Sequence, residues 1–154
     1  MPENRGVEEE DVPLSLAEKV AGRFAAERVA YSAVVLDEVS HRALLAWWPE
    51  ATNTPLLPKH FAHHMTIQLG PKQADLEALP LGEKVKLKVV GWAADERGQA
   101  VAVDCSVKST RAHPHITVAC SATGKPAYSN ELLSKGVTKI SGPTLTGTVE
   151  AVRS

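Results

Sequence analysis

Two stretches of the sequence carry an imidazole and a hydroxyl at the same spacing. Residues 64–67 are His-Met-Thr-Ile and residues 115–118 are His-Ile-Thr-Val, so each motif has the order His, any residue, Thr, aliphatic. Both motifs occur in apolar runs typical of β-strands, in which successive side chains point to opposite faces. We therefore expect the His and Thr of each motif to share one face of a strand, with aliphatic side chains behind them.

Two imidazoles and two hydroxyls in one site suit the cleavage of a phosphodiester. This reaction removes a proton from the attacking oxygen and delivers another to the departing oxygen, and an imidazole can do either near neutral pH. Hydroxyl donors beside the imidazoles can stabilise the charge that builds on the phosphoryl oxygens. The sequence therefore predicts four catalytic residues, which are His64, Thr66, His115 and Thr117.

Cationic and aromatic residues near the two motifs are candidate substrate contacts. A cation can hold a phosphate, and an aromatic ring can stack on a base. The candidates are Lys59, Phe61, Lys108, Arg111, Lys125 and Tyr128. Strict alternation along the first strand directs His63 away from His64, so His63 is not among the expected site residues.

The composition indicates one compact domain. The chain has 154 residues, of which 44% are hydrophobic and 23% are charged. A net charge of −1 argues against a protein that grips long nucleic acid, but it leaves a small nucleotide or an RNA end as a partner. Two cysteines in strand-like runs indicate thiols in a reducing compartment. With neither a leader peptide nor a long apolar run, we expect a cytoplasmic protein without a membrane partner.

Pro and Gly residues mark the turns between elements and divide the chain into about six strands and three or four helices. This pattern predicts the α+β class. Residues 1–13 are expected to be a flexible acidic tail and residues 14–154 a single domain, which begins with a helix capped by Ser15. Expected strands cover 29–36, the first motif, 85–93, 99–107, 111–120 and 144–152. Expected helices cover 37–48, capped by Ser40 and ended by Pro49, and 75–79 and 129–135.

The two motifs resemble the hallmark of the 2H phosphoesterase superfamily, the LigT-like RNA 2′,3′-cyclic phosphodiesterases. The segment from His113 through Gly124-Lys125-Pro126 to Leu133 is also similar to the phosphodiesterase-type domain of fungal tRNA ligases and related RNA-repair proteins. This resemblance implies a bilobal fold, with antiparallel sheets around a central cleft, helices outside, and one motif from each lobe. It also implies metal-independent hydrolysis without a cofactor, in which one His is the base and the other the acid. The two motif threonines would then bind the phosphate.

Two other classes of function remain as alternatives. A metal-dependent enzyme would use His113 with His115, or His63 with His64, as ligands for zinc or iron. No Asp or Glu lies in residues 116–128, so a carboxylate ligand would have to come from a distant residue such as Asp104. A non-catalytic module would keep the pocket for a nucleotide or an RNA end without turning it over.

Overall fold

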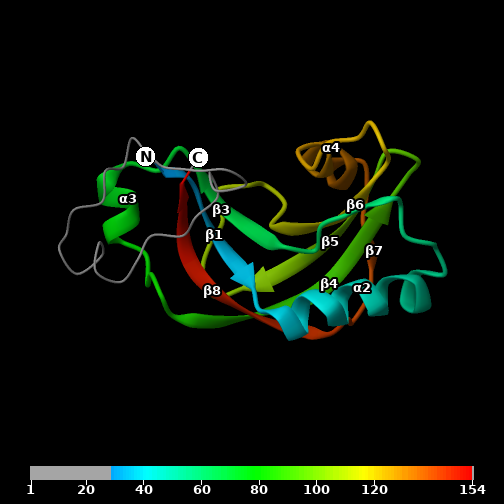
Figure 1. Ribbon diagram of the computed structural model, residues 1–154, viewed down its shortest axis with the longest axis horizontal. Coiled ribbons are helices and arrows are strands. Elements are labelled where there is room, and N and C mark those ends of the chain that lie inside the picture. The colour runs from blue at the N-terminus through cyan, green and yellow to red at the C-terminus, as the bar shows by residue number, and fades with distance from the viewer. Residues whose placement is uncertain (1–28, 154) are drawn as a thin grey trace.

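A computed structural model describes residues 29–153, which form one antiparallel sheet with helices on its outside (Figure 1). The expected acidic tail and the expected helix from Ser15 lie outside the described residues. The long strands are β1 (Val29–Leu36), β3 (His64–Leu69), β4 (Lys84–Ala94), β5 (Gly98–Cys105), β6 (His115–Cys120) and β8 (Thr144–Arg153). Two short strands are β2 (Lys59–His60) and β7 (Thr138–Lys139). The described helices are α2 (Glu38–Thr52), α3 (Gln73–Glu77) and α4 (Tyr128–Ser134).

The six long strands close into a barrel. Their order is β6-β3-β1-β8-β4-β5, and the pairing of β5 with β6 closes the sheet. Every pair is antiparallel. This confirms the expected α+β class. The expected bilobal arrangement is not confirmed, because one continuous sheet carries both motifs. The closure is uneven: β5 and β6 pair over five positions, whereas β3 and β6 pair only at Met65 and Ile116.

Alternation along the strands fills the barrel with aliphatic side chains. Met65, Ile116 and Val149 are fully buried members of one core cluster that draws on every long strand. Helix α2 adds Leu44 and Trp48 to the same cluster, and the Trp48 ring packs edge-on against Trp92 with centroids 5.6 Å apart. The apolar side of each motif strand therefore faces the core, as the pattern predicts.

Helix α2 is longer than the sequence predicts. Asp37, rather than Ser40, is its N-cap, because the Asp37 carboxylate accepts the Ser40 N–H at 2.7 Å. Pro49 lies inside the helix instead of ending it, since a proline removes only one backbone hydrogen bond and the buried Trp48 and Thr52 hold the surrounding turns against the core. Among residues 29–153, no helix combines the length and apolar character needed to cross a membrane.

Helix α4 packs on the outside of the barrel. Its side chains Tyr128, Leu132 and Leu133 form a small separate cluster with Ala93 and Ala100 of β4 and β5. Small residues on the outer face of the sheet allow this close approach. Because the His and Thr side chains of both motifs also point outward, α4 stands beside them and becomes one wall of the site.

Candidate functional site

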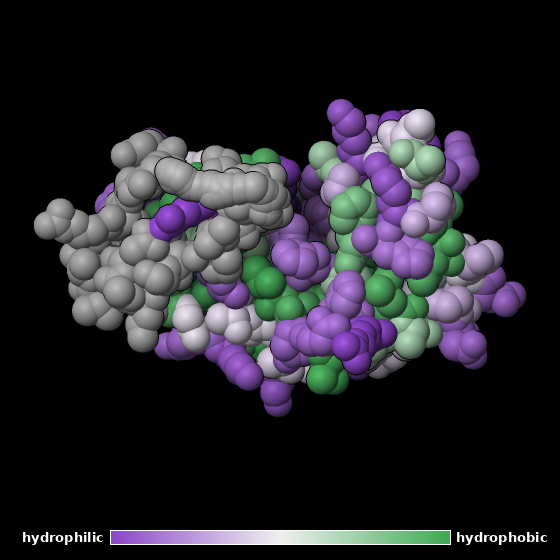
Figure 2. Space-filling model, viewed as in Figure 1, coloured by the Kyte–Doolittle hydropathy of each residue, from purple (hydrophilic) through white to green (hydrophobic). Residues whose placement is uncertain are grey.

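The two His-x-Thr motifs meet where β3 and β6 join. Extending the antiparallel pair Met65–Ile116 by one residue on each side places His64 across from Thr117 and Thr66 across from His115. All four side chains line one pocket of about 510 Å³. Figure 2 shows the surface hollowed beside α4. The two motifs are 51 residues apart in the sequence, and the structure brings their four expected side chains together.

Two of the expected substrate contacts also line this pocket, namely Phe61 and Arg111. Lys59, Lys108, Lys125 and Tyr128 are not among its lining residues. Tyr128 is instead largely buried between α4 and the outer face of the sheet. The lining further contains residues that the sequence analysis did not select, which are Tyr31, His63, Leu69, Pro126, Ala127 and Asn130.

A β-bulge explains why Leu69 reaches the pocket. Strict alternation predicts Leu69 on the core side with Met65, but the structure places it 55% exposed on the pocket side. Ala33 pairs with Thr66 and Ser32 with Gln68, so Ile67 is an extra residue that reverses the alternation beyond it. Leu69 then lies opposite Tyr31, and both side chains form an apolar wall. Bulges leave no reliable signal in the local sequence.

Both motif histidines have their Nδ1 atoms engaged by the protein. Nδ1 of His115 lies 2.7 Å from the carbonyl oxygen of His113 and must donate, because a carbonyl only accepts. Nδ1 of His64 lies 2.9 Å from Nδ1 of His63. The His64 ring also stacks on Tyr31 with centroids 5.1 Å apart. Each imidazole is therefore held in place, with Nε2 as the nitrogen available to a ligand.

The environment of the pocket favours neutral imidazoles. Burial, followed by the nearby His63 and His115, lowers the pKa of His64 from 6.5 to about 4. Burial also lowers the pKa of His115; the His113 carbonyl opposes this shift, while Arg111 and His113 add to it. The neighbouring side chains lower these pKa values because a protonated imidazole would be repelled by the positive charges around it. An anion bound among them would relieve the repulsion and favour protonation.

Arg111 brings a buried guanidinium atom to the pocket. The loop before β6 is tied to β3, because Ser109 Oγ donates to the Thr66 carbonyl at 2.8 Å and the Arg111 N–H donates to Ser109 Oγ at 3.0 Å. The Nε of Arg111 is buried and has no hydrogen-bond partner within residues 29–153. A buried N–H without an acceptor costs about 1–3 kcal/mol. A phosphate oxygen in the pocket would supply that acceptor.

Helix α4 contributes polar groups at its first turn. The hydroxyls of Thr117 and Ser129 lie 2.8 Å apart, and Thr117 Oγ1 also donates to the Pro126 carbonyl at 3.2 Å. Asn130, one residue further, lines the pocket. The position of α4 therefore sets the orientation of the Thr117 hydroxyl.

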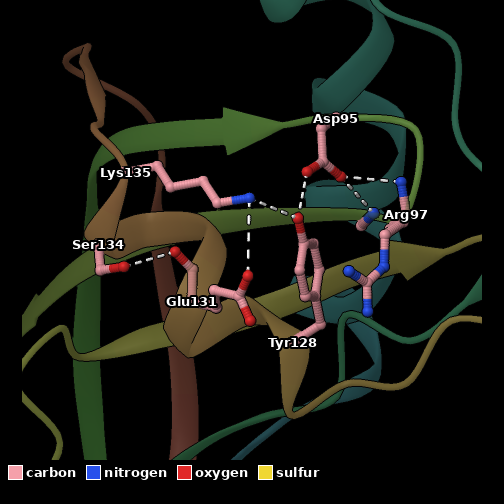
Figure 3. A network of polar contacts seen from close by, with 7 residues as sticks. Asp95, Arg97, Tyr128, Glu131, Ser134 and Lys135 are labelled. Carbon is pink, nitrogen blue, oxygen red and sulfur yellow. Dashed lines mark hydrogen bonds and ion pairs between the residues drawn. The ribbon is translucent and has the colours of Figure 1, made fainter.

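A polar network on the far side of α4 holds this helix against the barrel (Figure 3). The Tyr128 hydroxyl donates to Asp95 in the β4–β5 turn and accepts from Lys135 at 3.1 Å. The Arg97 guanidinium lies 4.1 Å from the centre of the Tyr128 ring. Burial by itself would raise the pKa of Asp95, but the hydrogen bonds from Tyr128 and from the Arg97 and Gly98 N–H groups hold it below its usual value.

The described part of the chain contains no group of three or more His, Cys, Asp or Glu side chains arranged to hold a metal ion. No family model matches the chain, and no curated protein matches it either.

Proposed function

We propose that the protein is a phosphodiesterase of the two-histidine type. Its substrate is a 2′,3′-cyclic phosphate at an RNA end or on a small cyclic nucleotide. The observation that supports this proposal most directly is the meeting of both His-x-Thr motifs in one pocket, where each His lies across from the Thr of the other motif. A pocket of about 510 Å³ also lies within the range of roughly 300–1,000 Å³ usual for small-molecule sites.

In the proposed reaction, water attacks the phosphorus of the cyclic phosphate. One imidazole accepts a proton from that water at Nε2 while the new P–O bond forms. The P–O bond to one ribose oxygen breaks, and the other imidazole delivers its Nε2 proton to that oxygen. The product is a phosphate monoester and a free ribose hydroxyl, and the two histidines exchange protonation states. The reaction needs no cofactor.

Three groups of the pocket suit the charge on the phosphate. Thr66 offers a hydroxyl beside the imidazoles, and Arg111 offers an Nε–H that has no hydrogen-bond partner among the described residues. Donors of this kind, fixed before the substrate arrives, stabilise the transition state without reorganisation. The Thr117 hydroxyl donates to the Pro126 carbonyl in the free protein and would turn its proton to the bound phosphate. Phe61, Tyr31 and Leu69 supply apolar surface for a base or a ribose.

Membership of the 2H phosphoesterase superfamily is part of this proposal, and so is a cytoplasmic location. The proposal also includes the two-lobed arrangement that the resemblance implies. The junction of β3 and β6, which pair at a single position, then corresponds to the cleft between the lobes, with one motif on each side.

The test is hydrolysis of a 2′,3′-cyclic mononucleotide in the presence of a chelator, with the phosphate monoester as the measured product. His64→Ala and His115→Ala should each lower kcat/KM by about 10²–10⁴-fold, because each removes a general acid or base. The double variant should lose little more than the worse single variant, because both groups act in one step. His60→Ala changes an exposed histidine of β2 outside the pocket lining and should keep wild-type activity.

Full activity in both single variants would refute the proposal. Binding of the cyclic nucleotide without product, even on long incubation, would instead identify a non-catalytic binding module. Activity that is lost in chelator and restored by a divalent metal would favour the metal-dependent alternative.

A further inference from the structure

His63 lies in the pocket because the chain makes a wide bulge before β3. His60 pairs with Ala119 of β6, and the next pair is Met65 with Ile116. Four residues of the segment between β2 and β3 therefore face two residues of β6. Ala62, within this bulge, has a φ of 54°, a left-handed conformation that a residue with a Cβ adopts at a cost. The bulge cancels the alternation that would turn His63 away from His64.

The bulge is fixed from three sides. The N–H groups of Phe61 and Ala62 donate to carbonyls of β6 at 2.8 and 2.9 Å. The Leu36 N–H at the end of β1 donates to the His63 carbonyl at 2.9 Å. From α2, Nδ1 of His41 donates to the Ala62 carbonyl at 2.9 Å. This backbone is therefore rigid, and the strained φ is compensated by its hydrogen bonds.

The two neighbouring imidazoles contact each other through identical atoms. Their Nδ1 atoms lie 2.9 Å apart, and the rings are nearly perpendicular, at 87°. One proton lies between the two nitrogens, so one ring donates and the other accepts. Two N–H groups facing each other at this distance would repel, so the pair accommodates a single proton at this contact.

Proton transfer at His64 decides which ring donates. Because Nδ1 is occupied by His63, the proton that His64 gains or loses in the reaction must be carried by Nε2. As a base, neutral His64 needs a lone pair on Nε2 and therefore a proton on Nδ1. As an acid, cationic His64 carries protons on both nitrogens. In either role Nδ1 of His64 is protonated, and Nδ1 of His63 must accept.

We infer that His63 is a positioning residue whose Nδ1 accepts the Nδ1 proton of His64 and so keeps Nε2 as the reactive nitrogen. This inference rests on the proposed function for its role in turnover. His63 does for His64 what the His113 carbonyl does for His115. A second imidazole thus takes the place that a carboxylate occupies in a Ser-His-Asp triad.

Direct observation of the tautomer tests this inference without any substrate. In the folded wild-type protein at pH 7, ¹⁵N NMR of the imidazoles should show His64 with a protonated Nδ1 and an unprotonated Nε2. His63→Leu removes the acceptor and should move His64 toward the Nε2–H tautomer. His63→Asn places an amide oxygen near the former Nδ1 position and should restore the wild-type pattern.

Turnover gives the second readout. His63→Leu should lower kcat about 10- to 100-fold with a smaller change in KM, because most of the His64 population would then have the wrong tautomer. His63→Asn should recover most of this loss. His63→Leu removes the hydrogen-bond partner of the His64 ring and should lower the free energy of unfolding by about 0.5–1.5 kcal/mol, which His63→Asn should largely recover. His60→Leu is the matched control for loss of an exposed histidine.

An Nε2–H tautomer of His64 in the wild-type protein would overturn the inference. So would a His63→Leu variant with unchanged tautomer and unchanged kcat. A wild-type protein that shows the expected tautomer but hydrolyses no cyclic phosphate would overturn the proposed function and leave the hydrogen-bond assignment intact.

Discussion

At the scale of single residues, the site relies on two imidazoles that the protein keeps largely neutral. The pKa of His64 is lowered to about 4, and that of His115 is lowered from 6.5, in both cases first by burial. A base is active above its pKa and an acid below its own. The free protein can therefore hold one neutral and one charged ring only at mildly acidic pH.

This arrangement predicts the pH dependence of the proposed reaction. The kcat/KM profile should be a bell, with an acidic limb near pH 4 and a basic limb below 6.5. The profile of kcat should lie at higher pH, because the bound phosphate anion favours protonated imidazole. Initial rates measured from about pH 3 to about pH 8.5 at constant ionic strength cover both limbs of each profile. A kcat/KM profile with both limbs above 6.5 would contradict the burial of the two rings.

At the scale of elements, α4 links the outer network to the pocket. Tyr128 faces Asp95 and Lys135, whereas the next two residues, Ser129 and Asn130, face Thr117 and the pocket. The helix has only seven residues, too few to be stable alone, so its docking on the barrel determines its position.

Substitutions of Tyr128 should separate docking from hydrogen bonding. Tyr128→Phe keeps the ring in its apolar cluster but removes the hydroxyl, so the free energy of unfolding should fall by about 1–2 kcal/mol with little change in kcat/KM. Tyr128→Ala also removes the ring and should cost about 3 kcal/mol or more. Because α4 would then shift, kcat/KM should fall as well. Urea unfolding and initial rates on the same samples provide the check, and full activity in Tyr128→Ala would show that α4 does not orient the site.

At the scale of the whole molecule, the buried imidazoles link folding to pH. His64 has a folded-state pKa of about 4 against about 6.5 in the unfolded chain. Between these values the unfolded chain binds more protons than the folded one, so the folded state loses stability as the pH falls from 6.5 towards 4. Above pH 6.5 the ring is neutral in both states, and its contribution no longer changes.

Removal of this titrating group should make stability less dependent on pH. Between pH 7 and 4.5, His64→Gln should lose about 2–3 kcal/mol less free energy of unfolding than the wild-type protein. His60→Gln, in the exposed strand β2, is the matched control and should follow the wild type. Urea unfolding at the two pH values measures both differences. Parallel losses in all three proteins would show that His64 titrates alike in the folded and unfolded chains.

The local pattern of the sequence determined the main strands and the direction of the motif side chains. Alternation placed Met65 and Ile116 in the core and the His and Thr of each motif on the opposite face, because side-chain direction in a regular strand depends only on the backbone repeat. The run of apolar and β-branched residues at Val29–Leu36 predicts a strand with the bounds that the structure shows, because such residues favour strands.

Only the tertiary structure decided how these strands meet. The closed sheet, the pairing of Met65 with Ile116, and the bulges at Ala62 and Ile67 all depend on contacts between distant segments. The bulges bring His63 and Leu69 to the pocket, against their expected direction. The docking of α4 likewise turns Tyr128 away from it. Register and bulges are set by pairing with a partner strand, and a single strand's sequence does not carry that information.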